Sequence, residues 1–193
     1  MSNCGEPVRR VTMRLKKLKT PGLIIGMALA VLLASPTPAS IVVGAVIVCI
    51  GEAIRIWAAG HLMRKQVLAT SGPYAYVRDP LYLGRFFLVI GFCVMGWGYC
   101  LLLLPVALGI FFLSYMPRKY QKEMKWLEDL FGEEYRRYVA SVKSLIPRLT
   151  PYPYSDRKRW SFSLLWHENR EQYFLLIVLA VFAGMIVKYS FSV

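Results

Sequence analysis

The chain has 193 residues, 56% of them hydrophobic, a mean hydropathy of +0.45 and a net charge of +13. This composition and its long apolar runs favour a membrane domain over a soluble one. The 24 Lys and Arg residues fall in blocks beside the apolar runs, which fits membrane topology and anionic headgroups and argues against nucleic acid as the partner. The four cysteines show no paired spacing, so we expect no disulfide framework and no zinc or other metal site.

We expect one all-α, polytopic membrane domain over residues 1–193, beginning with a basic cytoplasmic tail at 1–20. Residues 21–60 predict a helical hairpin, with spans at Leu23–Ala34 and Ile41–Gly60 joined by an uncharged Pro/Ser turn. A basic start, a short apolar run and small residues are also typical of a secretory signal. We favour the hairpin, because cleavage would remove half of its packing.

The second span contains two charged residues, Glu52 and Arg55, whose i, i+3 spacing puts them on one helix face. One interpretation is a self-satisfied ion pair near the helix end, with Arg55 extending outward to water. The other is that both face a polar substrate or cofactor cavity, which is the usual role of charge inside a membrane. We favour the second.

Residues 61–149 predict the catalytic core, whose centre is the polar, aromatic stretch 70–84. Gly72-Pro73 indicates a turn, and Pro80 suits the first position of a helix with Asp79 as its N-cap. The positive end of that helix favours a bound anion such as a carboxylate. The tyrosines of this stretch, at positions 74, 76 and 82, either line a site or form an aromatic belt at the headgroups.

Two more spans follow, at Leu81–Trp97 and Cys100–Met116, the first with glycines at 84, 91 and 96 for close helix packing and the second ending at Pro117. Residues 118–138 then predict an amphipathic cytoplasmic helix broken near Gly132, with its apolar side at Met124, Leu127, Leu130 and Phe131.

Residues 150–193 comprise an interfacial segment and the last span, about Tyr173–Tyr189. The polar cluster Trp166–Glu171, including His167 and Arg170, either closes over the cofactor or acceptor, or serves helix capping and headgroup contact. Lys and Arg are absent from the turns at 35–40 and 97–100 and concentrated in the other connections. Five spans with a cytoplasmic N-terminus satisfy this charge pattern.

Residues 78–84 have the sequence Arg-Asp-Pro-Leu-Tyr-Leu-Gly. This resembles the Arg-His-Pro-x-Tyr-x-Gly signature of the isoprenylcysteine carboxyl methyltransferase family and of its phospholipid N-methyltransferase relatives. A Glu-x-x-x-Leu pattern at 123–127, a Phe-Gly-x-x-Tyr pattern at 131–135 and Ile146-Pro147 are similar to the motifs that follow it in the family. Gly51-Glu52-x-x-Arg55 is similar to a motif that precedes it.

The resemblance implies an integral membrane enzyme that uses S-adenosylmethionine, bound at the cytoplasmic face. It implies a cofactor pocket made by Tyr74, Arg78, Asp79, Pro80, Tyr82, Gly84 and Glu123. It also implies that Glu52 and Arg55 face the methyl acceptor. Two departures from the family pattern matter: Asp79 stands where the family has His, and Met124 where it often has a second acid.

Methyl transfer from a sulfonium needs mainly alignment and exclusion of water. A carboxylate acceptor is already ionised, and Arg55 or Arg118 could hold it in a bidentate pair. An amine acceptor must lose a proton, which would make Glu52 a general base. The hydrocarbon part of a lipid-linked acceptor would enter between helices, among the membrane lipids.

We therefore expect a methyltransferase acting on a membrane-embedded acceptor, most like the isoprenylcysteine carboxyl methyltransferases. The alternatives are lipid amine N-methylation, an NADPH-dependent membrane reductase and a non-catalytic membrane interaction protein. The sequence shows no Gly-x-Gly-x-x-Gly motif after a strand and no alternation of strands and helices, and the number of predicted spans alone excludes a soluble Rossmann-type methyltransferase.

Overall fold

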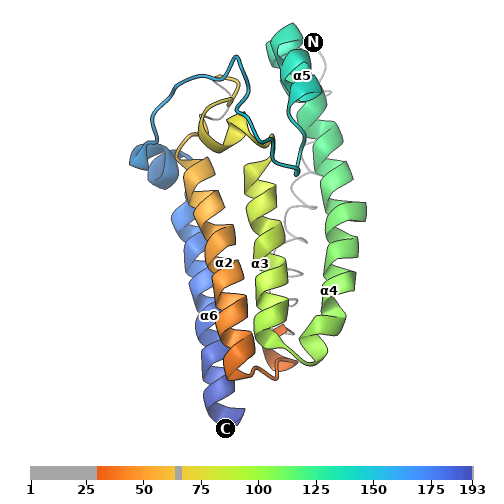
Figure 1. The fold of residues 1–193 in the computed structure, drawn as a ribbon, viewed down its shortest axis with the longest axis vertical. Helices are drawn as coiled ribbons and strands as arrows, with labels where there is room; N and C mark the ends of the chain where they lie inside the picture. The colour runs from red at the N-terminus through yellow and green to blue at the C-terminus, as the bar shows by residue number, and fades with distance from the viewer. Residues whose placement is uncertain (1–29, 64–66, 193) are drawn as a thin grey trace, which may run out of the picture.

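The computed structural model describes residues 30–63 and 67–192, and this part of the chain is helical without any strand. Its long helices run side by side as a bundle, with the long connecting segments gathered at the upper end and short turns at the lower end (Figure 1). The elements are α2 (Pro38–Ala59), η1 (Gly72–Ala75), α3 (Pro80–Gly96), α4 (Tyr99–Gly109), η2 (Ile110–Tyr115), α5 (Met116–Ser141), η3 (Leu164–Glu168) and α6 (Glu171–Ser192). The predicted all-α class is confirmed for these residues.

Two helices, α2 and α6, are long and apolar enough to cross a membrane, with mean hydropathies of 2.1 and 2.2. The third and fourth predicted spans form shorter apolar helices, at Pro80–Gly96 and Tyr99–Leu113. The basic tail at 1–20 and most of the first predicted span, Leu23–Ala34, lie outside the described residues. The count of five spans and their orientation stay predictions.

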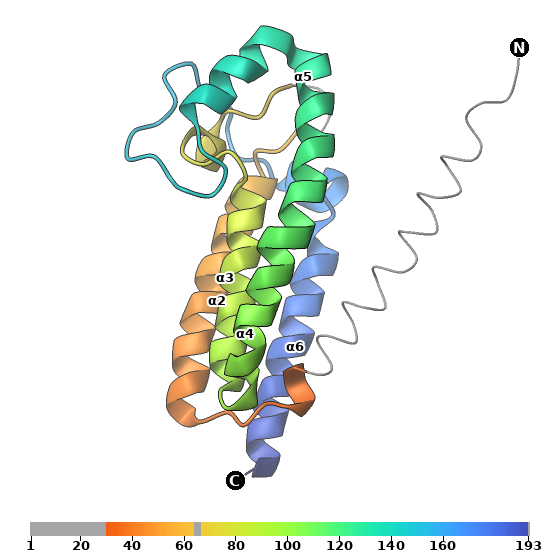
Figure 2. The same ribbon diagram turned by 90° about the vertical axis from the view of Figure 1, so that its right-hand side faces the viewer.

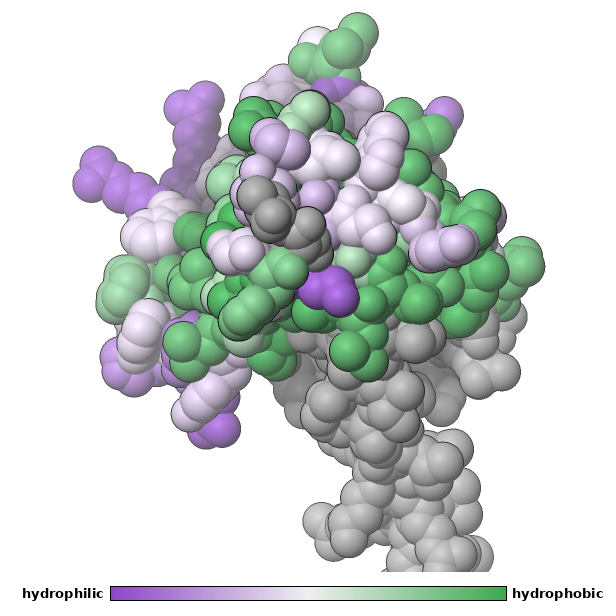
Figure 3. Space-filling view, turned by 90° about the horizontal axis from the view of Figure 1, so that it is seen from below, coloured by the Kyte–Doolittle hydropathy of each residue, from purple (hydrophilic) through white to green (hydrophobic). Residues whose placement is uncertain are grey.

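The two uncharged turns predicted between apolar segments lie together at one end of the bundle. Thr37 is the N-cap of α2 and forms a capping box with Ser40, which satisfies the first N–H groups of the helix. The backbone N–H of Ser35 donates to the carbonyl of Gly96, 2.8 Å away, and so ties this turn to the end of α3. Figure 3 views the molecule from that end, where most of the atoms in view are green or pale and purple side chains lie mainly at the periphery.

Glycines bring the backbones of α2 and α3 into direct contact. A methyl group added at Gly44 would lie 2.7 Å from the carbonyl oxygen of Gly91, and one at Gly51 would lie 2.8 Å from that of Gly84. Each helix therefore carries two glycines seven residues apart, which meet their partners in antiparallel order. The prediction that Gly84 and Gly91 allow close helix packing is confirmed.

The end of the fourth predicted span stays a prediction, but the helix does not stop at Pro117, where that span ends. Instead α4, η2 and α5 follow one another without a break, as one long rod in Figure 2. Proline in an α-helix clashes with the carbonyl four residues earlier, but here the residues just before it form the wider π-helix η2. The wider turns make room for the ring, so the helix continues.

The predicted break in α5 is confirmed at Gly132, whose φ of +51° and ψ of −122° are not helical. The helix bends there and folds over the end of the bundle (Figure 2). Met124, Leu127 and Phe131 pack as predicted against a buried cluster, whereas Leu130 is 48% exposed. The buried cluster consists of Leu68, Ala75, Tyr135, Tyr138, Val142 and Tyr152.

Candidate functional site

The signature stretch folds as a turn that leads into α3. Pro80 is the first residue of that helix and Asp79 occupies the N-cap position, as predicted. The Asp79 side chain makes no capping hydrogen bond, however. Its carboxylate instead accepts a hydrogen bond from the hydroxyl of Ser144, at 2.6 Å, and lies 3.4 Å from Nε of Arg78. The acid is therefore directed sideways, towards the segment after α5.

The segment 143–152 runs alongside the signature and fixes its backbone. The N–H groups of Arg78 and Asp79 donate to the carbonyls of Lys143 and Ser144, at 2.9 and 3.1 Å. The N–H of Arg148 in turn donates to the carbonyl of Tyr76, at 2.8 Å. The Ile146-Pro147 motif, far from the signature in sequence, thus lies within a segment that is hydrogen-bonded to it.

An apolar groove with a volume of about 420 Å³ opens between α3, η2 and this segment. Pockets that hold small molecules and cofactors usually measure roughly 300–1,000 Å³. The polar residues of its lining are Lys143 and Ser144, and Ser144 also holds Asp79. The apolar lining is formed by Leu83, Phe86, Phe112, Leu145 and Ile146. The groove combines a hydrophobic surface with charge and hydroxyl groups.

A buried charge cluster lies at the same end of α3, and Arg55 is its centre. The Arg55 side chain is 1% exposed, so the interpretation in which it extends outward to water is wrong. Its Nε lies 3.6 Å from Oε2 of Glu52, and its Nη2 forms an ion pair and hydrogen bond with Oε2 of Glu171. Its Nη1 lies 3.5 Å from the carbonyl of Leu81, and its Cζ lies 3.6 Å from the centre of the Phe174 ring.

Glu52 is less well satisfied than Arg55. It is 7% exposed, and neither of its carboxylate oxygens has a hydrogen-bond partner in the described part of the structure. The predicted interaction between Glu52 and Arg55 is confirmed, whereas the role of the pair towards an acceptor stays a prediction. The partner that sequence reasoning missed is Glu171, the first residue of α6. No signal in the sequence pairs it with Arg55, because an acid in the first turn of a helix is also favoured by the helix dipole.

The signature and the Gly51-Glu52-x-x-Arg55 motif are in contact. A methyl group at Gly84 would lie 2.4 Å from Cγ of Arg55 and 2.7 Å from the carbonyl oxygen of Gly51. The glycine that closes the signature therefore makes room for the arginine of the earlier motif. The two motifs form one structural unit.

The signature tyrosines do not form an exposed belt. Tyr74 and Tyr82 are 6% and 7% exposed, so the aromatic-belt interpretation is wrong for these two. The carbonyl of Tyr74 accepts a hydrogen bond from the hydroxyl of Tyr138, at 2.7 Å. Burial and, next, the negative charge of Asp79 raise the pKa of Tyr138 above its ordinary range. That hydroxyl therefore remains a donor and holds η1 against α5.

Two predicted site residues, Arg118 and Glu123, lie on α5, but their side chains fall outside the described residues. In the cluster 166–171, Asn169 has a structural role. Its Nδ2 group donates to the carbonyls of Ala59 and Leu62, at 2.8 and 2.9 Å, and so caps the end of α2. This agrees with the helix-capping interpretation of that cluster.

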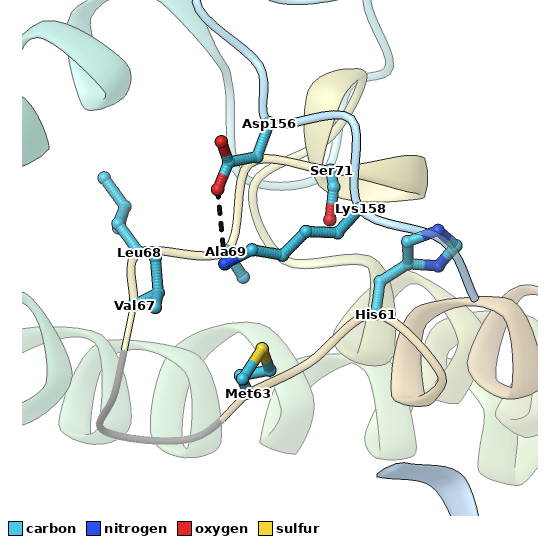
Figure 4. A pocket seen from close by; sticks show the side chains of 8 residues that line it. All are labelled: His61, Met63, Val67, Leu68, Ala69, Ser71, Asp156 and Lys158. Carbon is cyan, nitrogen blue, oxygen red and sulfur yellow. Dashed lines mark ion pairs between the residues drawn. The ribbon is translucent and has the colours of Figure 1, made fainter. Parts of the chain in front are cut away.

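A second hollow lies between the end of α2 and the segment 67–71 (Figure 4). The space inside it that is open to a water-sized sphere is about 0 Å³ and therefore far below the usual range for ligand pockets of roughly 300–1,000 Å³. Asp156 and Lys158 pair across its edge at 3.2 Å, and His61 has its Nδ1 atom 3.0 Å from the carbonyl of Trp57. We therefore place the candidate site at the groove and the charge cluster.

Comparisons with protein-family models, with curated proteins and with solved structures found no match for this chain.

Proposed function

We propose that the protein is an S-adenosylmethionine-dependent methyltransferase that acts on a membrane-embedded acceptor. One observation carries the proposal: the first turns of α3 join the groove to the buried charges. Leu83 and Phe86 line the groove, while Leu81 and Gly84 contact Arg55. A binding surface and a buried ionisable cluster thus share one short stretch of helix, and that stretch is the signature.

The groups around the groove suit the proposed cofactor. S-adenosylmethionine supplies an activated methyl group when bound, and it carries an ammonium, a carboxylate and a flat aromatic base. Asp79 has the charge to hold the ammonium, Lys143 the charge to hold the carboxylate, and Phe86 and Phe112 offer rings against which a base can pack. Pro80, Tyr82 and Gly84 are buried and would shape the pocket.

For the acceptor, the resemblance favours a carboxylate, as on a prenylated cysteine. A carboxylate held by Arg55 would have to compete with Glu171 and Glu52, which already occupy its guanidinium. Arg118 is then the remaining candidate for that role.

Lipid amine N-methylation is a second candidate, and the state of Glu52 favours it. An ammonium must lose a proton before its nitrogen can attack a methyl group. The buried carboxylate of Glu52, whose oxygens make no hydrogen bond within the described residues, is the group that would accept this proton.

The first experiment is calorimetric titration of the detergent-purified protein with S-adenosylhomocysteine, the demethylated product, and separately with NADPH. We expect micromolar binding of the first ligand alone. Asp79→Asn should weaken this binding, whereas Asp156→Asn, which removes an exposed acid elsewhere, should leave it unchanged. Binding of NADPH alone would replace the proposal with a reductase, and binding of neither would favour a non-catalytic protein.

The acceptor class is then tested by transfer of a radiolabelled methyl group to prenylcysteine or to an aminolipid. A methyl ester is released by mild base and an N-methyl group is not, so the two products are distinguished chemically. Glu52→Gln should abolish N-methylation without changing S-adenosylhomocysteine affinity. If it leaves N-methylation intact, Glu52 is not the base.

A further inference from the structure

Three large aromatic side chains are exposed on the segment before α6. Trp160, Phe162 and Trp166 are 41%, 55% and 43% exposed. The rings of Phe162 and Trp166 stack with centres 5.5 Å apart, and those of Trp160 and Phe162 lie 6.4 Å apart. They form one continuous aromatic surface, which together with residues 157–159 we call the strap.

The strap is held at the level where the two membrane-spanning candidates end. The indole N–H of Trp160 donates to the carbonyl of Ile56, at 3.1 Å, and the N–H of Ser161 donates to that of Gly60, at 2.9 Å. Since α2 ends at Ala59 and α6 begins at Glu171, this level is one boundary of the apolar layer. In Figure 1 the blue turn η3 projects sideways beside the upper ends of α2 and α6.

Basic side chains precede the aromatic ones directly. Arg157, Lys158 and Arg159 are all exposed. Lys158 pairs with Asp156 at 3.2 Å, but no ion pair joins Arg157 or Arg159 to any acid in the described part of the chain. Both guanidinium groups can therefore bind an anion, and they belong to the residues that directly precede the aromatic surface in the chain.

We infer that the strap binds the headgroup of an anionic phospholipid. The aromatic rings occupy the zone between headgroups and acyl chains, where Trp and Phe are favoured. Arg157 and Arg159 hold the phosphate of the lipid, because a planar guanidinium group can donate two parallel hydrogen bonds to a phosphate. Because the strap is a lateral surface away from the groove, this inference does not rest on the proposed methyltransferase function.

The first test is native mass spectrometry of the full-length protein, purified from bilayers of mixed phosphatidylglycerol and phosphatidylcholine. We expect retained phosphatidylglycerol in preference to phosphatidylcholine. Each basic side chain near an anionic surface strengthens binding about fivefold, so Arg157→Gln with Arg159→Gln should weaken the retention roughly 25-fold. The matched control, Lys125→Gln with Arg137→Gln, removes two exposed charges from α5 and should retain the lipid as the wild type does.

The second test measures tryptophan fluorescence in vesicles, with Trp57, Trp97 and Trp126 replaced by Phe so that emission comes from the strap. Phosphatidylglycerol brominated on its acyl chains should quench this emission more strongly than brominated phosphatidylcholine. Equal quenching by both lipids, or equal retention of both in the first test, would overturn the headgroup assignment. Unquenched emission at the wavelength of water-exposed tryptophan would show that the strap lies outside the bilayer.

Discussion

Gly84→Ala tests the contact between the two motifs. The added methyl carbon would lie 2.4 Å from Cγ of Arg55, more than 1 Å inside the carbon–carbon optimum of roughly 3.5–4.0 Å. Arg55 cannot simply turn away, because its far end is held by Glu171, and the carbonyl of Gly51 closes the other side. Overpacking typically lowers the free energy of unfolding by about 1–3 kcal/mol, whereas replacing Gly by Ala in a helix raises it by about 1 kcal/mol. The methyl group collides with both the Arg55 side chain and the Gly51 carbonyl, so we take the upper end of the overpacking cost and expect a net loss of about 2 kcal/mol.

The assay is thermal unfolding of the detergent-purified variant, where about 2 kcal/mol corresponds to a midpoint roughly 4–8 °C lower. Gly109→Ala is the matched control, since a methyl group there meets no atom within 4 Å and should leave the midpoint unchanged or slightly higher. Equal midpoints for the two variants would refute the backbone contact between α2 and α3 on which the argument rests.

Three further changes probe the site. Arg55→Met should lower the free energy of unfolding by about 3–5 kcal/mol, because it leaves the carboxylates of Glu171 and Glu52 buried without a cation. Thermal unfolding measures this loss, and a loss below about 1 kcal/mol would contradict the reasoning. Tyr138→Phe should cost about 1 kcal/mol at neutral pH, from the lost hydrogen bond. Since the pKa of Tyr138 is raised in the folded state, the wild type loses its advantage as pH rises above about 10. The difference in unfolding free energy between the two proteins should therefore shrink by about 1.4 kcal/mol in total between pH 9 and pH 11, most of it above pH 10, and a constant difference would refute the raised pKa. Ser144→Ala removes a hydrogen bond to Asp79 and should weaken S-adenosylhomocysteine binding about fivefold, as measured by calorimetry. Unchanged affinity would mean that Asp79 does not contact the ligand.

The features that sequence predicted correctly depend on neighbouring residues. The start of α3 at Pro80, the contact between Glu52 and Arg55 and the break at Gly132 each follow from local geometry or from a spacing of three residues. The pattern of glycines at 84 and 91 predicted close packing, although not which helix would meet them.

The features that sequence missed depend on contacts between distant residues. Glu171 lies 116 positions from Arg55, and no local pattern pairs them. Ser144 turns the Asp79 carboxylate away from the helix end, so the acid occupies the cap position without capping. The π-helix before Pro117 likewise lets the chain continue as a helix through a proline that reads locally as a stop signal.

The glycine contacts between α2 and α3 also determine which half of the molecule can move. Two helices whose backbones touch at two levels cannot slide or rotate against each other without collision. The opposite wall of the groove belongs to η2, in the middle of the long rod that continues into α5. Any widening of the groove would therefore come from that rod or from the segment 143–146, while α2 and α3 stay fixed relative to each other.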